Sequence, residues 1–202
     1  PAVYEMYFEK HLSAGEDVLY VCFSSKLSGM AATASSSMEA LKEKYPDRKL
    51  ICLDSLCASV GEGFLVYAAA QLKRQGLSIE GLADWLLLHR LRVCHRFTVT
   101  DLLELQRGGR LSATTAKLGT ALNIKPVLHV DDEGRLVYVS KTRGRKKSLI
   151  ALAEHMDETW TPDLGKTVFI AHGDAPDDAE FLQKRILKRH ADAQVTILPL
   201  GP

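Results

Sequence analysis

The sequence predicts an α/β fold of two α/β domains, a Rossmann-like N-terminal part with a parallel sheet and an α+β C-terminal part. Three observations predict it. Strand and helix patterns alternate through the first half, a hairpin interrupts them in the second half, and 202 residues suffice for two small cores. We place the boundary near residue 92, which gives domains of residues 1–92 and 93–202.

The first half repeats a strand–turn–helix unit. Asp17–Phe23 is a continuous apolar run, typical of a buried parallel strand, and a helical pattern follows over Met30–Lys44. The unit returns in the strand Lys49–Leu53 and the helix Gly61–Arg74. Tandem units of this kind predict parallel strands with helices packed on the sheet. Two more helices are expected, Tyr4–Leu12 and Leu77–Arg90, the second with Ser78 as its N-cap.

The second half is marked by a hairpin. Asp131–Gly134 has the composition of a tight turn, with a strand pattern on each side. A hairpin mixed with crossover helices indicates an α+β domain. The expected strands are Arg96–Thr100, Ile124–Val130, Arg135–Ser140, Thr167–Ala171 and Gln194–Leu198. The expected helices are Leu102–Gln106, Thr114–Leu122, Ser148–Thr159 and Asp177–His190.

The composition is that of an ordinary globular protein, with 46% apolar and 25% charged residues. A net charge of +1 creates no overall field that would attract nucleic acid. No apolar run approaches the roughly 20 residues that span a bilayer, and no secretory signal is recognised. The cysteines lack Cys-x-x-Cys spacing, so we expect buried reduced thiols, no metal site and a cytoplasmic protein. They are Cys22, Cys52, Cys57 and Cys94.

One loop stands where a parallel sheet binds ligands. Such sites lie at the carboxyl ends of strands, where helix N-termini offer unpaired N–H groups to an anion. Ser28 and Gly29 precede the helix Met30–Lys44 in this way. The hydroxyl can donate to an oxyanion, and glycine lets a ligand approach the backbone. The alternative is that Ser28 only caps the helix.

Two basic segments follow. Arg107–Arg110 holds two glycines between arginines, which predicts a flexible loop whose guanidinium groups suit a carboxylate or phosphate. A solvated turn is the alternative. Lys141–Lys147, which contains Arg143 and Arg145, is a dense basic cluster. A solvated face, a nucleic-acid patch and a docking surface for an acidic protein all fit it, although the lack of interleaved aromatic residues weakens the nucleic-acid option.

Signatures of catalysis fail when tested. The chain has no Gly-x-Ser-x-Gly elbow and no His-Glu-x-x-His pair, and Gly165–Thr167 imitates a P-loop but leads into a strand pattern. His172 follows a strand and could orient an anion. Asp174 is expected to cap the helix that comes next.

Taken in order, a series of segments resembles the DegV family of bacterial fatty-acid-binding proteins. The segments are SSKLSGM, DSLCASVGEG, DLLELQRGGRLS, NIKPVLHVDDEGRLVYVSKTRGRKK and HGDAPDDAE. The resemblance covers essentially the whole chain, and the stretch from RGGRLS to NIKP is its most specific part.

The resemblance implies a ligand cleft between two α/β domains that holds a single long-chain fatty acid, with its carboxylate in the cleft and its tail in an apolar tunnel. It implies that Ser28 hydrogen-bonds the carboxylate, that Gly29 supplies backbone, and that Arg110 lies beside the head group. Arg143 and Arg145 fall in a segment that looks like a docking surface for a fatty-acid kinase.

By the same resemblance the protein is a carrier with no catalytic residue, metal or cofactor of its own. It would present the acid to a separate kinase, which makes an acyl phosphate for phospholipid synthesis. Transient membrane contact is allowed, and nucleic acid is not an expected partner. The alternatives are a small-molecule enzyme for a phosphorylated or carboxylated metabolite, using Ser28, Arg110 and His172, and an RNA-binding module using Arg143–Lys147.

The chain departs from the family pattern at three places. Met30-Ala31 replaces the usual Thr-Tyr after Ser-Gly. A Thr-Ser-Gln segment that adds a carboxylate ligand would precede Pro1, and a His-x-Gly-Pro-Gly segment would follow Pro202. We therefore expect a first domain that lacks its N-terminal strand and a second domain cropped at its C-terminus.

Overall fold

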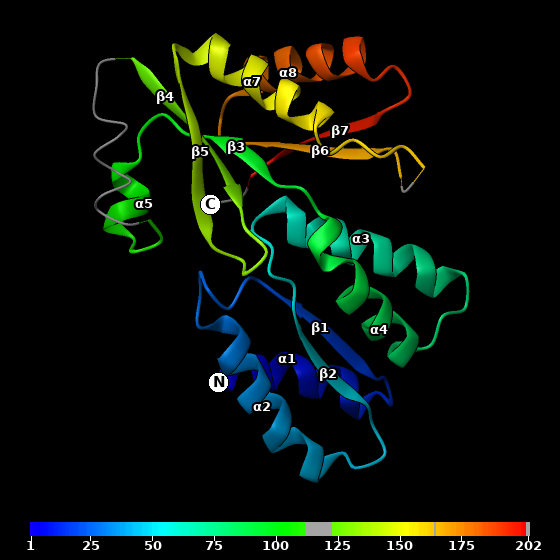
Figure 1. The fold of residues 1–202 in the computed structure, drawn as a ribbon. Coiled ribbons are helices and arrows are strands. Elements are labelled where there is room, and N and C mark those ends of the chain that lie inside the picture. The colour runs from blue at the N-terminus through cyan, green and yellow to red at the C-terminus, as the bar shows by residue number, and fades with distance from the viewer. Residues whose placement is uncertain (112–122, 164, 201–202) are drawn as a thin grey trace. The chain divides into compact units, whose positions relative to one another are not determined.

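The computed structural model describes residues 1–111, 123–163 and 165–200. These residues form two compact units (Figure 1). The first unit comprises Pro1–Val93 together with Asp132–Arg135, and the second comprises Cys94–Asp131 and Leu136–Pro202. The helix expected over Thr114–Leu122 lies outside the described residues.

The first unit has helices on both faces of a parallel pair of strands. The strands are β1 (Val18–Cys22) and β2 (Leu50–Asp54), and Val18 lies opposite Leu50 in the register. The helices are α1 (Ala2–Ser13), α2 (Met30–Lys44), α3 (Val60–Arg74) and α4 (Ile79–His89), followed by a 3-10 turn, η1 (Arg90–Arg92). As predicted, Ser78 caps α4, because its hydroxyl accepts the N–H of Gly81 at 3.2 Å.

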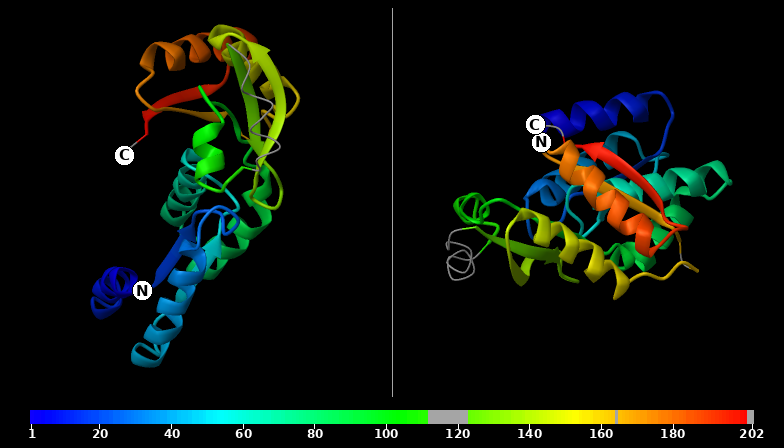
Figure 2. Two further views of the ribbon diagram at one scale, coloured as in Figure 1. Left: turned by 90° about the vertical axis from the view of Figure 1, so that its left-hand side faces the viewer. Right: turned by 90° about the horizontal axis from the view of Figure 1, so that it is seen from above.

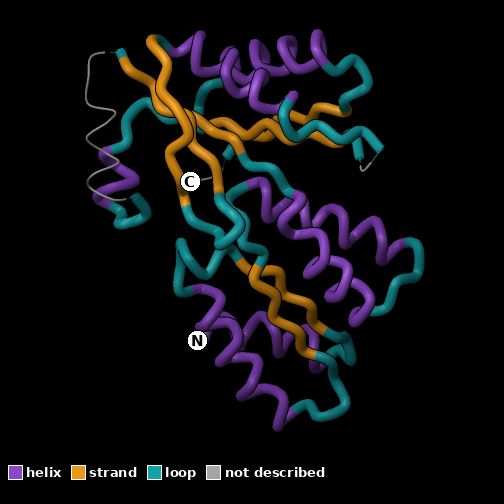
Figure 3. The backbone as a smooth tube through the Cα atoms, in the orientation of Figure 1, coloured by secondary structure: helices purple, strands orange, loops and turns teal. Residues whose placement is uncertain are grey.

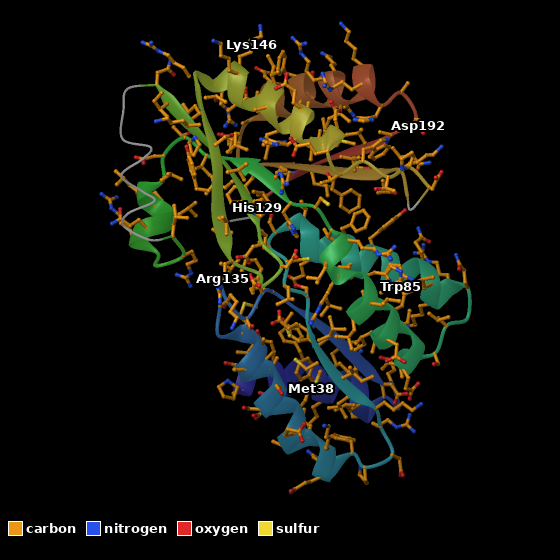
Figure 4. All side chains as sticks on the ribbon, in the orientation of Figure 1. Met38, Trp85, His129, Arg135, Lys146 and Asp192 are labelled. Carbon is orange, nitrogen blue, oxygen red and sulfur yellow. The ribbon has the colours of Figure 1, made fainter. Side chains whose placement is uncertain are left out.

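Alternation along β1 divides the core of this unit into two layers. Leu19 and Val21 face α3 and α4, whereas Val18 and Tyr20 face α1 and α2 (Figure 1). One layer contains the buried residues Leu53, Cys57, Leu65, Ala69, Leu82 and Leu86. The other contains Phe8, Leu12, Ala34, Met38, Leu41 and Leu50, of which Met38 is labelled in Figure 4. This α/β/α arrangement confirms the predicted fold class.

The second unit combines an antiparallel sheet with a parallel pair. The antiparallel sheet has the order β3–β4–β5, and β6 pairs with β7 in parallel (Figure 3). The strands are β3 (Arg96–Thr98), β4 (Ile124–Val130), β5 (Leu136–Arg143), β6 (Thr167–His172) and β7 (Gln194–Pro199). The helices are α5 (Leu103–Arg107), α7 (Arg145–Asp157) and α8 (Pro176–Arg189). Both α7 and α8 lie on the same face of the β6–β7 pair, where Ala153, Ile170, Leu182 and Ile186 are buried (Figure 2).

Two sequence expectations need correction. The helix predicted to begin at Ser148 begins at Arg145, and β5 continues to Arg143, where it pairs with Ile124. Gly144, with φ +92°, makes the sharp turn between them, so the basic cluster is divided between a strand end and the first turn of α7. The cysteines are not all buried, because Cys94 is exposed.

Candidate functional site

The loops that follow β1 and β2 are joined by hydrogen bonds. These loops leave the same end of the parallel pair (Figure 3). The Asp54 carboxylate accepts the N–H of Ser25 at 3.2 Å and that of Leu56 at 3.0 Å. The N–H of Ser24 donates to the carbonyl of Cys57 at 2.9 Å. Asp54 therefore positions both loops, a role that sequence reasoning missed although an Asp at a strand end is a recognisable signal.

Ser28 and Gly29 stand together at the N-terminus of α2. The Ser28 hydroxyl accepts the N–H of Met30 at 3.3 Å, and the Ser28 N–H donates to the carbonyl of Ser24 at 3.1 Å. Gly29 is the N-cap residue, so Ser28 lies one position before the cap, where its hydroxyl keeps a proton to donate.

The space beside Gly29 is open. Its φ is −74°, which any residue can adopt, and a Cβ added there would meet no atom within 4 Å. A ligand can therefore approach the backbone at this point. The first N–H groups of a helix lack partners within the helix and carry partial positive charge, so this approach favours an anion.

Arg110 is held by a helix cap. Gly109 has φ +74°, and its N–H donates to the backbone carbonyl of Gln106 at 2.8 Å. The Arg110 N–H donates to the backbone carbonyl of Leu105 at 3.0 Å. This pair of bonds is a Schellman motif at the end of α5, with Gly109 in the left-handed position. The backbone of the loop predicted to be flexible thus forms a hydrogen-bonded cap, and its flexibility stays a prediction. The exposed Arg110 guanidinium contacts the carbonyl of Gly108 within the same turn.

The two arginines of the basic cluster have different surroundings. Arg143 is exposed at the end of β5. Arg145 is partly buried, and its Nε donates to the carboxylate of Asp178 on α8 at 2.6 Å. Lys146, labelled in Figure 4, places its Nζ 5.4 Å from the centre of the Phe181 ring. Arg145 thus helps to join α7 to α8, whereas Arg143 is open to solvent.

His172 has a local structural role. Its Nδ1 accepts the N–H of Ala175 at 3.2 Å, just before α8. The expectation that Asp174 caps α8 is wrong, because the N-cap position is Ala175 and no side chain caps the helix. Asp174 has φ +49° and forms the turn between His172 and Ala175. This turn lets the His172 ring accept the Ala175 N–H.

The candidate residues are divided between the units. Ser28 and Gly29 belong to the first, and Arg110, Arg143 and Arg145 to the second. Among the described residues, no group of three His, Cys, Asp or Glu side chains is arranged to hold a metal ion. In the same residues, no helix has the length and apolar character needed to cross a membrane.

The whole chain matches one protein family. The family model described as an uncharacterised protein of the DegV family covers residues 1–202. The chain belongs to the DegV family. A DegV domain-containing protein of Clostridium perfringens is 40% identical over 194 residues, which are 96% of this chain and 67% of that protein. A DegV domain-containing protein of Lactococcus lactis is 36% identical over 195 residues, again 96% of this chain and 67% of the relative.

Solved structures of DegV proteins have the same fold. A DegV family protein from Ruminococcus gnavus with vaccenic acid aligns with a TM-score of 0.87 at 26% identity, covering 97% of this chain and 70% of that one. The Streptococcus pneumoniae Fatty Acid Kinase (Fak) B3 protein loaded with linoleic acid aligns with a TM-score of 0.85 at 26% identity. The alignment covers 95% of this chain and 68% of that one. A DegV family protein from Thermus thermophilus, described by its fatty-acid binding, aligns with a TM-score of 0.82 at 29% identity. The alignment covers 98% of this chain and 69% of that one.

Proposed function

We propose that this DegV protein binds one long-chain fatty acid and that Ser28 and Gly29 hold its carboxylate. The observation that carries the proposal is the open N-terminus of α2, where a hydroxyl with a proton to donate stands beside a glycine with empty space around it. Fatty acids bound to DegV proteins of similar fold support the choice of ligand. Arg110 is the third donor that we propose for the carboxylate.

Energetics explain why a fatty acid suits a site with few polar groups. Burying a methylene contributes about 0.8 kcal/mol, so about fifteen of them supply roughly 12 kcal/mol before ordering costs. The tail then dominates affinity, and we propose that it occupies an apolar tunnel. The carboxylate must still be paired, because an ionised group that is desolvated without donors costs several kcal/mol. Ser28, the backbone at Gly29 and Arg110 are donors of the required kind.

A hollow between α7 and α8 is a poor candidate for the tail. It has a volume of about 290 Å³, and its lining is mainly charged. The lining residues are Ile150, Ala153, Glu154, Arg185, Lys188 and Arg189. An acyl chain gains its affinity from apolar surface, so this hollow does not supply what the tail needs.

We further propose that the protein is a carrier without catalysis of its own, which presents the acid to a fatty-acid kinase for acyl-phosphate formation. The likeness to the Fak B3 protein supports a kinase partner. The proposed docking residues are Arg143, which is exposed, and Arg145, which starts α7 and whose Nε already donates to Asp178. Planar guanidinium groups recognise carboxylates on a partner well.

The test is fatty-acid binding by the full-length protein and by matched pairs of variants. Ser28→Ala should weaken binding, whereas Ser25→Ala, an exposed serine in the same loop, should not. Arg110→Ala should weaken binding, whereas Arg107→Ala, an exposed arginine paired with Glu104, should not. Equal affinities within both pairs would rule out the proposed carboxylate site.

A further inference from the structure

Two cysteines lie side by side on the parallel strands of the first unit. The Sγ atoms of Cys22 on β1 and Cys52 on β2 are 3.2 Å apart. Cys52 lies opposite Tyr20, so Cys22 is two residues further along β1 and on the same face of the sheet. A disulfide bond is about 2.05 Å long, so the sulfurs must approach by about 1 Å to form one, and because the two residues are diagonal neighbours the strands must shift as well.

The two thiols differ in accessibility and acidity. Cys22 is 0% exposed, whereas Cys52 is only partly buried. The Cys52 Sγ also donates to the carbonyl oxygen of Ala31 at 3.8 Å. A chain of hydrogen bonds therefore runs from Cys22 through Cys52 to α2. The hydrogen bond from Cys22 lowers the pKa of Cys52, against the opposing effects of burial and of the Asp54 charge. The same hydrogen bond, followed by burial, raises the pKa of Cys22.

We propose that Cys22 and Cys52 form a redox-active thiol pair that hydrogen peroxide oxidises to a disulfide. The Cys52 sulfur attacks one peroxide oxygen, the O–O bond breaks, and the leaving oxygen takes the Cys52 proton and departs as water, which gives a sulfenic acid on Cys52. The Cys22 sulfur then attacks the Cys52 sulfur, the S–O bond breaks, and a second water leaves with the Cys22 proton. Two thiols lose two electrons, and the peroxide is reduced to two waters.

The geometry also predicts a disulfide that is easily reduced. The cysteines are diagonal rather than opposite in the register, so closing the bond strains the paired strands. Strained disulfides have more oxidising potentials and are the labile ones. Reversibility by a mild thiol reductant is therefore part of the proposal.

The experiment treats the full-length Cys94→Ser protein with hydrogen peroxide. This variant removes the exposed thiol, which would otherwise couple two molecules. We expect intact mass to fall by two hydrogens, peptide mapping without reductant to join the Cys22 and Cys52 peptides, and dithiothreitol to reverse the change. A mass that gains only oxygen, or a disulfide that involves Cys57, would overturn the proposal.

Single substitutions distinguish the roles of the two sulfurs. In Cys22→Ser the sulfenic acid on Cys52 has no partner, so a dimedone label should accumulate there. In Cys52→Ser, Cys22 should stay reduced, because it is fully buried and its less buried partner is gone. Labelling of Cys22 in place of Cys52 would contradict the assignment. Circular dichroism confirms that each variant is folded. If either variant fails to fold, the peptide mapping of the Cys94→Ser protein still tests the proposal, because Cys22 and Cys52 are both unchanged in it.

Discussion

The hydroxyl of Ser24 donates a hydrogen bond to the carbonyl of Gly134 at 2.7 Å, across 110 positions of sequence. Ser24 is 0% exposed and follows β1, and Gly134 lies in the short segment Asp132–Arg135 that belongs to the first unit. A Cβ added at Gly134 would lie 2.3 Å from the Ser24 Oγ and 3.2 Å from the Leu56 Cα. This contact fixes the loop that leads to Ser28.

Gly134→Ala should therefore destabilise the first unit strongly. Gly15 is a matched control, because it has the same φ of +82° but open space around it. Gly15→Ala should cost about 1–2 kcal/mol from the left-handed conformation alone. Gly134→Ala should cost about 1–3 kcal/mol more from the steric clash. Urea denaturation of both variants measures the difference, and equal losses would show that the Ser24–Gly134 contact is looser than described.

Gly29→Ala should separate ligand binding from stability. The backbone at Gly29 suits alanine and no atom lies where the Cβ would go, so unfolding free energy should be unchanged or rise by up to about 1 kcal/mol. The methyl group would occupy the space that we assign to the carboxylate, so fatty-acid affinity should fall about tenfold or more, the equivalent of about 1.4 kcal/mol. Gly63→Ala, in α3 and equally open, is the control. Unchanged affinity in Gly29→Ala, measured by calorimetry, would remove Gly29 from the site.

Gly109 should matter for binding through backbone conformation. Gly109→Ala strains the left-handed cap that positions Arg110, so fatty-acid affinity should fall in the direction of Arg110→Ala. Gly109→Asn should retain more affinity, because asparagine tolerates this conformation. Binding measured by displacement of a fluorescent fatty acid distinguishes the variants. If alanine and asparagine behave alike, the cap does not control Arg110.

The second unit should lose an ion-pair contribution at low pH. The hydrogen bonds of Asp157 with Arg189 and His190 lower the pKa of Asp157 to about 2. In the unfolded chain the Asp carboxyl has a pKa of about 3.9, so between the two pKa values the folded state binds fewer protons than the unfolded state. The stabilisation is present above the unfolded pKa and is lost as pH falls through about 2. Exposure of these side chains keeps the effect modest.

Asp157→Asn tests this dependence. Its stability deficit should be present near neutral pH and should vanish at the acid end of the titration. The fluorescence of Trp160 follows unfolding of this region, because the Trp160 ring centre lies 4.9 Å from that of His190. A deficit that is constant with pH would assign the role of Asp157 to packing rather than to charge.

Local patterns predicted much of the fold. The apolar runs of β1 and β2 and the helical spacing of α2 and α3 specify their own conformations, and the predicted parallel pair is present. Ser78 was found because an N-cap depends on residues next to it in sequence. The start of α7 was placed too late, because the basic residues Arg145–Lys147 oppose the helix dipole, and tertiary contacts such as Arg145–Asp178 offset this effect.

Other features depend on contacts between distant segments. Nothing near Ser24 or Gly134 in sequence indicates that they meet, and Cys22 and Cys52 become a pair only through the register of β1 and β2. The hydrogen-bonded cap at Gly109 was missed because two adjacent glycines fit a flexible loop as well as a Schellman motif. The motif-based choice of Ser28, Gly29 and Arg110 stays a prediction.

Native mass spectrometry of the purified full-length protein, followed by lipid extraction, tests the central claim most directly. We predict one long-chain fatty acid released per chain from the unmodified protein and from Ser25→Ala, with loss of the bound acid in the Ser28→Ala/Arg110→Ala double variant. An unmodified protein that carries no lipid and fails to take up added fatty acid would contradict the claim.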